Sequence, residues 1–218
     1  MNFVINGLTG GVNGMEYPAL IMLSPSIPLE EYEKMGYTQD SDEVQMMLEE
    51  NDRATCHEIA HQWFYGIVGN DQIASPWLDE GMCRFSEYLY QKEYPPAVSA
   101  EDDYSLLENR FKDMHMMVSG EDSKSGMSYA PDTTYLGESL YYWMENDPMG
   151  YGEVYVKGAS LLYQMQQQLG EDAFADALKE YVDTFAYSQV TAEEFESFWN
   201  EKQDFSELFK VYFRGKAN

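Results

Sequence analysis

The sequence predicts an α+β protein that is predominantly helical, with a small N-terminal lobe that contains β-strands. Residues 1–41 are rich in glycine, proline and short apolar runs such as 19–23, a composition typical of short strands and turns. From Asp42 onward, apolar residues recur at helical spacing instead. The 218-residue chain is 44% hydrophobic and 15% aromatic, which is enough to build a core. We therefore expect 1–218 to form one domain, with the helical lobe at 42–218.

The helices of the second lobe are expected from the spacing of apolar residues and from the signals at their ends. Gly170 should end one helix as a C-cap, and Thr191 with Glu194 should form a capping box that begins another. The polar Ser/Gly/Pro segment 118–135 is expected to be a loop. The expected helices cover residues 42–67, 77–92, 101–117, 153–169, 171–186 and 192–202.

Charge and cysteine content exclude several classes of protein. The chain has 39 acidic and 13 basic residues, a net charge of −26, so it should repel phosphate backbones and bind no nucleic acid. No apolar run approaches the roughly 20 residues of a membrane helix, and no signal peptide is visible. Cys56 and Cys83 form neither a disulfide framework nor a cysteine-rich zinc site. The acidity fits an exported bacterial protein and a cytosolic one equally, so the location stays open.

Two histidines four residues apart are the strongest signal of function. His57 and His61 stand in the segment CHEIAHQWF, and on a helix they lie about 40° apart in projection and one turn apart along the axis. Two imidazoles in this arrangement can bind one zinc ion, and the carboxylate of Glu58 can accept a proton from an attacking water molecule. The apolar stripe of the same helix is expected to face the core. The stripe consists of Cys56, Ile59, Ala60, Trp63 and Ile67.

Glu80 is the expected third ligand of the zinc ion. A hydrolytic zinc site needs three protein ligands and one open position. Eighteen residues separate His61 from Glu80, which leaves room for a turn and a return helix. A carboxylate among the apolar neighbours of Glu80 is costly unless it is paired or bound to a metal. Glu87 and Asp79 are candidates to accept hydrogen bonds from the second nitrogen atoms of the histidines.

Three further motifs accompany the HExxH-x18-E pattern of the zinc ligands. Residues 14–18 read GMEYP, residues 61–70 begin with HQWF and end with GN, and residues 155–158 read YVKG. In this order the four motifs resemble those of the M1 family of gluzincin metallopeptidases, with their G-x-M-E-N, HQWFGN and Y-x-K-G segments. Asn13-Gly14 and Tyr17 depart from the family's usual Gly-Ala and Asn, which leaves the substrate preference open.

The resemblance implies a thermolysin-like catalytic domain that binds one zinc ion and removes the N-terminal residue of peptides with a free N-terminus. By the same resemblance, Glu58 acts as general base and Tyr155 donates a hydrogen bond to the oxyanion. Glu16 recognises the α-ammonium group of the substrate. The backbone around Gly14 and Met15 aligns the peptide as an extended strand.

Members of the family also have a large β-rich domain before the G-x-M-E-N segment. That domain is missing here, so we expect the chain to be part of a longer protein. Two alternatives stay open on the sequence alone. One is a zinc endopeptidase, or a zinc hydrolase with another reaction such as epoxide opening. The other is a catalytically silent module that uses the same fold to bind peptides.

Overall fold

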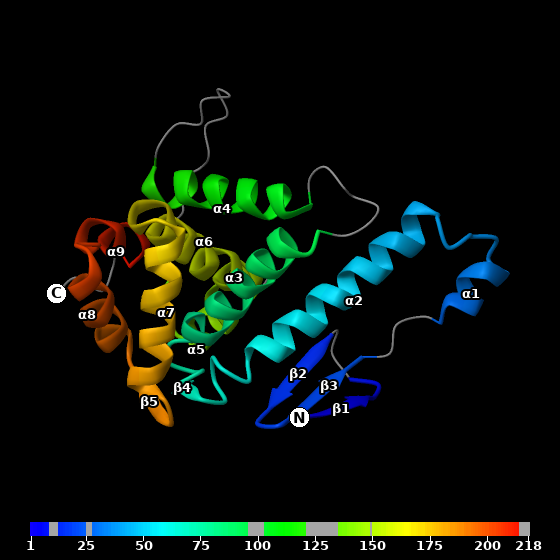
Figure 1. Cartoon of the computed structure of the whole chain (residues 1–218), viewed down its shortest axis with the longest axis horizontal. Coiled ribbons are helices and arrows are strands. Elements are labelled where there is room, and N and C mark those ends of the chain that lie inside the picture. The colour runs from blue at the N-terminus through cyan, green and yellow to red at the C-terminus, as the bar shows by residue number, and fades with distance from the viewer. Residues whose placement is uncertain (9–12, 25–27, 96–102, 121–134, 149, 214–218) are drawn as a thin grey trace.

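The computed structural model describes residues 1–8, 13–24, 28–95, 103–120, 135–148 and 150–213 (Figure 1). The order of elements is that of a small β-containing region followed by a helical one, as the sequence predicts. The elements are β1 (Asn2–Ile5), β2 (Gly14–Tyr17), β3 (Leu20–Leu23), α1 (Leu29–Lys34), α2 (Asp42–Ala60), β4 (Val68–Asn70), α3 (Trp77–Glu93), α4 (Asp103–Ser119), α5 (Leu140–Asn146), a 3-10 turn (Gly150–Gly152), α6 (Glu153–Leu169), α7 (Glu171–Phe185), β5 (Ser188–Val190), α8 (Ala192–Lys202) and α9 (Ser206–Tyr212).

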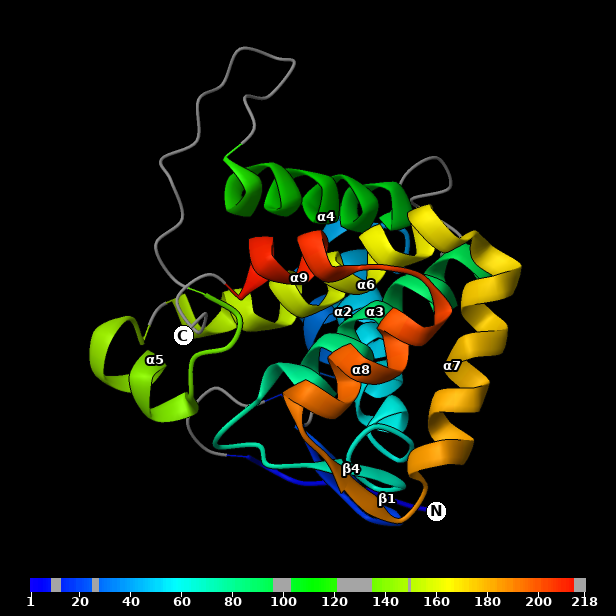
Figure 2. The ribbon, with the colours of Figure 1, turned by 90° about the vertical axis from the view of Figure 1, so that its left-hand side faces the viewer.

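Helices α3 and α6 form the centre of the helical region. Both pack against α4, and α6 also contacts α7 and α9, so these helices surround the central pair (Figure 2). The two central helices approach closely where Gly81 faces Gly158, because a Cβ on Gly81 would lie only 2.7 Å from the Cα of Gly158. Only glycine leaves enough space for this contact between backbones. The crossing therefore fixes α3 against α6 beside Glu80 and Tyr155.

Aromatic side chains fill the core between the central helices and the C-terminal ones. The ring of Trp77 on α3 packs edge-on against Phe195 of α8, with centroids 5.0 Å apart. Phe174 of α7 stacks on Trp199 of α8, also with centroids 5.0 Å apart. Aromatic pairs of this kind add to the free energy of burying large apolar surfaces. The many aromatic residues of the sequence thus form much of the core of the helical region.

The N-terminal sheet has the strand order β1-β3-β2 and lies against α2 (Figure 1). Strand β1 pairs parallel with β3, and β2 pairs antiparallel with it, with Glu16 opposite Ile21. Gln62, just after α2, ties the sheet to that helix. Its Nε2 donates to the carbonyl of Tyr17 at 3.2 Å, and its Oε1 accepts from the N–H of Ala19 at 2.8 Å. The edge strand β2 is thereby held beside the histidines.

Several helix boundaries agree with the sequence prediction. Helix α6 covers Glu153–Leu169 and ends at Gly170, whose φ is 91°. The capping box of Thr191 and Glu194 is present at the start of α8. Helix α4 runs to Ser119, two residues past its expected end, and most of the expected loop that follows lies outside the described residues.

The expected helix over 42–67 is too long. Helix α2 ends at Ala60, and the chain turns at Tyr65, whose φ of 116° no helix allows. The turn leads into β4, which pairs in parallel with β5 from the far end of the chain. Trp63 was expected in the buried stripe, but 48% of its surface is exposed because the helix no longer carries it toward the core.

Residues 1–41 also contain more than strands and turns. Helix α1 occupies Leu29–Lys34, directly after Pro28 and with two glutamates in its first turn. Proline before a helix and acids at its start both favour this position. Among the described residues, no helix combines the length and apolar character that a membrane crossing requires.

Candidate metal centre and active site

His57 and His61 lie at the C-terminal end of α2 with their rings facing one another. His61 keeps helical backbone angles and donates its N–H to the carbonyl of His57, although it stands just past the last residue of α2. The Nε2 atoms of the two imidazoles are 3.2 Å apart, and the rings meet edge to face. The four-residue spacing therefore places both side chains on one face, as predicted.

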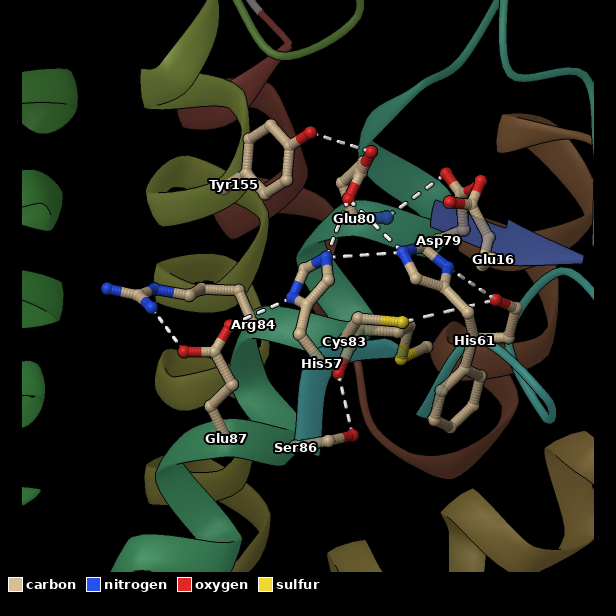
Figure 3. Close-up of polar contacts among 12 residues, drawn as sticks. Glu16, His57, His61, Asp79, Glu80, Cys83, Arg84, Ser86, Glu87 and Tyr155 are labelled. Atoms are coloured by element: carbon tan, nitrogen blue, oxygen red, sulfur yellow. Dashed lines mark hydrogen bonds and ion pairs between the residues drawn. The ribbon is translucent and has the colours of Figure 1, made fainter. Parts of the chain in front are cut away.

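Glu80 completes a group of three ligand atoms from the first turn of α3 (Figure 3). Its Oε2 lies 3.0 Å from His57 Nε2 and 3.4 Å from His61 Nε2. Ligands bonded to zinc at roughly 2.0–2.1 Å in a tetrahedron are about 3.3–3.4 Å from each other. The three measured separations, 3.0, 3.2 and 3.4 Å, are close to the edges of such a tetrahedron. The two nitrogen atoms and one oxygen atom thus fit a zinc ion.

The second nitrogen atom of each histidine is held by an oxygen atom. His61 Nδ1 donates to the carbonyl of Phe64 at 3.1 Å, and His57 Nδ1 lies 2.8 Å from Glu87 Oε1. A carbonyl can only accept, so Nδ1 of His61 carries a proton, and in the neutral ring Nε2 is the atom whose lone pair can bind a metal ion. Hydrogen bonds of this kind orient histidine ligands for metal binding. Glu87 has the role expected from the sequence, whereas a backbone carbonyl such as that of Phe64 gives no sequence signal.

The contacts among His57, His61 and Glu80 favour a positive charge between these side chains. Burial would lower the pKa of His57, but its hydrogen bonds to Glu80 and Glu87 outweigh this effect and raise the pKa to about 10. Burial would raise the pKa of Glu80, but the hydrogen bonds to His57 and His61 lower it to about 2. The cluster thus holds a proton in the place where a divalent cation fits.

Asp79 does not contact the histidines in the way the sequence suggested. Its Oδ1 accepts a hydrogen bond from Asn70 Nδ2 at 3.0 Å, and its Oδ2 accepts one from Gln72 Nε2 at 2.7 Å. The side chain faces the segment around β4 because it precedes Glu80 by one residue on α3. Asp79 therefore links the loop before α3 to the metal centre.

Glu58 is a buried carboxyl group next to the two histidines. Burial raises its pKa to about 7, although positive charge on His57 or His61 has the opposite effect. Its Oε2 has no hydrogen-bond partner among the residues that the structure describes. Gly14 lies so close that a Cβ there would collide with the Glu58 carboxyl group. A side chain at position 14 would therefore displace the carboxyl group of Glu58.

Tyr155 reaches the metal centre from the first turn of α6. Its hydroxyl group donates a hydrogen bond of 2.8 Å to Glu80 Oε1 (Figure 3). Burial and the nearby negative charge of Glu80 raise the pKa of Tyr155, so the hydroxyl group stays protonated. The Gly81–Gly158 crossing brings the two helices close enough for this contact. The side chain of Tyr155 thus points toward the two imidazoles and Glu80.

Glu16 lies on the other side of the imidazole pair, on β2. Its Oε1 accepts a hydrogen bond from Gln72 Nε2 at 3.0 Å. Ligand atoms of Glu16, His61 and Asp79 lie within 4.8 Å of one another. The structure therefore brings all the expected side chains together, with Glu16 and Asp79 forming an acidic side of the site. Gln72, which bridges the two acids, was not singled out from the sequence.

Comparison with known proteins identifies the family. The model of the peptidase family M1 domain matches residues 10–212. The chain belongs to peptidase family M1. Aminopeptidase Q of Acinonyx jubatus is 28% identical to it over 165 residues, which are 70% of this chain and 15% of that protein. Aminopeptidase N of Oryctolagus cuniculus is 33% identical over 141 residues, which are 62% of this chain and 13% of that protein.

The fold of this M1 domain has solved counterparts. A mutant M1 zinc metallopeptidase from Deinococcus radiodurans superposes with a TM-score of 0.62 at 18% identity, covering 97% of this chain and 39% of that one. The predominantly helical α+β fold expected from the motifs is thereby confirmed. The M1 domain described here corresponds to a minor part of the length of each relative.

Proposed function

We propose that this M1 domain is the catalytic part of a zinc-dependent aminopeptidase, which hydrolyses the first peptide bond of peptides with a free N-terminus. The observation that carries the proposal is the near-tetrahedral spacing of the ligand atoms of His57, His61 and Glu80. Tyr155 and Glu58 lie directly beside these ligands. The names of the relatives, aminopeptidases N and Q, support the same activity.

The ligand set supports a single zinc ion. Two imidazole nitrogen atoms and one carboxylate oxygen atom leave one position of a tetrahedron open, as catalytic zinc sites require. When bound, the ion supplies Lewis acidity, which polarises the scissile carbonyl group and lowers the pKa of water. The oxygen acceptors at both Nδ1 atoms keep the imidazoles oriented for this ligand.

Glu58 takes the proton of the attacking water molecule and then delivers it to the leaving nitrogen atom. A group that works as both base and acid should have a pKa near the working pH. Burial brings the pKa of Glu58 to about 7, and its Oε2 makes no hydrogen bond within the described part of the chain, so that this atom is free to accept a proton. The side chain lines an open cavity of about 460 Å³ that gives a peptide access.

Tyr155 stabilises the negative charge that develops on the carbonyl oxygen atom of the substrate. Its hydroxyl group is protonated and is held by Glu80 Oε1, at the edge of the ligand group. A substrate carbonyl beside the ligand atoms would accept this hydrogen bond in place of Glu80 Oε1, because the hydroxyl group has only one proton to donate. Hydrogen-bond donors of this type stabilise the charge that develops in the transition state.

Glu16 binds the α-ammonium group of the substrate. A carboxylate close to the ligands can form an ion pair that only the end of a peptide chain offers. Glu16 Oε1 is oriented by Gln72, and Asp79 adds a second carboxylate nearby. Gly14 and Met15 precede Glu16 on the edge strand β2, whose outer side pairs with no other described strand. The edge is suited to align a peptide in an extended conformation.

The acidic side of the site favours the aminopeptidase over the endopeptidase alternative. An endopeptidase has to accept the main chain that precedes the scissile bond, where Glu16 and Asp79 offer only negative charge. The complete set of ligands, base and hydroxyl donor argues against a silent peptide-binding module.

The decisive experiment compares a peptide with a free N-terminus with its N-acetylated form, using the full-length protein. We expect cleavage of the free peptide only, and equal cleavage of both would contradict the role of Glu16. The variant Glu58→Gln should bind zinc as the wild type does and lose about 10²–10⁴-fold in kcat. Zinc content by metal analysis separates a lost ligand from a lost base.

A further inference from the structure

An arginine-lined cavity adjoins the metal centre on the side away from Glu16. The cavity of about 460 Å³ is lined by Arg53 of α2, Arg84 of α3 and Arg110 of α4, together with His57 and Tyr155. These are three of the four arginines in the whole chain, whose net charge is −26. No lysine is among the described residues of the lining. A concentration of guanidinium groups at one point of such an acidic protein calls for a functional explanation.

The carboxylates of the cavity leave the arginines only partly paired. Glu87 is shared, because it binds His57 Nδ1 and also accepts a hydrogen bond from Arg84. Arg53 Nε lies 3.8 Å from Glu87 Oε2 and makes no hydrogen bond within the described residues. Burial lowers the pKa of Arg84, and the positive charges of Arg53 and Arg110 lower it further, against the opposing effect of Glu87. Arg84 is thus close enough to Arg53 and Arg110 for their positive charges to oppose its own.

The remaining carboxylates of the lining have other roles. Glu50 Oε1 accepts a hydrogen bond from Asn13 Nδ2 at 3.2 Å. Glu58 also lines the cavity and is the proposed general base. Arg110 is exposed and, among the described residues, forms no ion pair. A guanidinium group is therefore available to a ligand at the open side of the cavity.

The positions of the site residues set the direction of a bound peptide. Figure 3 shows Glu16 and Asp79 on one side of the two imidazoles, and Arg84 with Glu87 on the other. A peptide whose ammonium group is at Glu16 places its first carbonyl group beside Tyr155 and the ligand atoms. The residue after the scissile bond then enters the cavity of the arginines.

We propose that this cavity binds a carboxylate group carried by the residue that follows the scissile bond. The group is either the C-terminal carboxylate of a dipeptide or the side chain of an aspartate or glutamate. Guanidinium groups form paired hydrogen bonds with carboxylates, a geometry that lysine does not offer. The inference rests on the proposed function and extends it: preferred substrates are dipeptides and peptides with an acidic second residue.

The test measures binding to the full-length Glu58→Gln protein by calorimetry, so that turnover does not interfere. Alanyl-alanine is compared with alanyl-alanine amide, and alanyl-aspartate amide with alanyl-asparagine amide. We expect at least one acidic ligand to bind roughly tenfold more tightly than its neutral partner. A difference in affinity within the first pair assigns the cavity to a C-terminal carboxylate, and a difference within the second pair assigns it to an acidic side chain. Equal affinities within both pairs would overturn the inference, because an anion gains nothing from the overall charge of this protein.

Variants of the arginines test whether the cavity is the origin of the preference for acidic ligands. Arg110→Gln and Arg53→Gln, each in the Glu58→Gln protein, should reduce the preference for the acidic ligand several-fold. Arg110 is exposed, so its replacement leaves folding intact, and zinc content checks the metal centre. The matched control is Lys179→Gln on α7, where an exposed lysine pairs with Asp176, and it should leave the preference unchanged. A preference that survives both arginine variants would exclude the cavity as its origin.

The wild-type protein keeps the two proposals distinguishable. If no peptide with a free N-terminus is cleaved, the aminopeptidase proposal fails, while the binding comparison still decides the role of the arginines. If acidic and neutral peptides are cleaved and bound equally well, the aminopeptidase proposal stands and the inference about the cavity fails.

Discussion

The proposed metal ligands and the proposed ammonium-binding residue are held by two very different parts of the molecule. His57, His61 and Glu80 come from helices that pack around the buried α3–α6 pair. Glu16 lies on a three-stranded sheet in which every residue of β1 is exposed. Gln62 contributes two of the hydrogen bonds that connect this sheet to the end of α2. The proposed metal binding therefore depends on the helical core, whereas the proposed alignment of the substrate depends on a few polar contacts.

The largest effect is expected from removing a ligand in the helical part. His61→Ala should lose zinc and reduce kcat/KM by at least about 10³-fold, because several kcal/mol of transition-state stabilisation come from the metal. Metal analysis and steady-state kinetics measure both effects. A chelator should inactivate the wild type reversibly, with recovery on adding zinc. One tightly bound zinc ion in an active His61→Ala protein would refute the ligand assignment.

A smaller effect is expected at Tyr155, which touches a ligand without being one. Tyr155→Phe should lower kcat about 10²–10³-fold, as typical for the loss of one oxyanion donor, because only the hydroxyl group is removed. Zinc content and thermal unfolding should match the wild type. If zinc is lost along with activity, the hydroxyl group acts through Glu80 rather than on the substrate.

The hydrogen bond between His57 Nδ1 and Glu87 should have a smaller effect on activity than the hydroxyl group of Tyr155. Glu87→Gln keeps the size of the side chain but removes the negative charge that orients the imidazole, so the affinity for zinc should fall about 10–100-fold. Competition with a fluorescent chelator gives this affinity. Activity at saturating zinc should largely return, whereas a loss that zinc does not restore would point to a different role for Glu87.

The smallest effect is expected at the link between sheet and helices. Gln62→Ala removes the hydrogen bonds to Tyr17 and Ala19, which together contribute on the order of 1–2 kcal/mol. KM for a free peptide should rise several-fold, with zinc content unchanged. Gln45→Ala, on α2, is the control, because the side chain of Gln45 donates to the nearby Gln39 carbonyl and not to the sheet. A loss of zinc in Gln62→Ala would show that the two parts are not independent.

The sequence predicts the helical part of this M1 domain best where local signals decide the structure. The end of α6 follows from Gly170 and the start of α8 from the Thr191 capping box, both of which act within one helical turn. The end of α2 could not be found in this way. It depends on the pairing of β4 with β5, between residues more than a hundred positions apart.

The candidate site also contains residues that local sequence signals predict and residues that only the tertiary structure brings together. Helix periodicity indicated His57 and His61. Glu80 was indicated by the need for a third ligand, by its apolar neighbours and by the spacing that the family motif shares. The carbonyl of Phe64, the bridging amide of Gln72 and the three arginines have no local pattern. Arg53, Arg84 and Arg110 come from three helices and meet only when the tertiary structure forms.

The contact between Gly81 and Gly158 couples two functional groups mechanically. Glu80 precedes one glycine directly, and Tyr155 stands three residues before the other, so one backbone contact determines the distance between them. Any side chain larger than a hydrogen atom would act as a wedge at this point. It would move Glu80, the proposed third ligand, and Tyr155, the proposed hydroxyl donor, apart in one step. This pair of glycines therefore sets the geometry of the proposed catalytic centre.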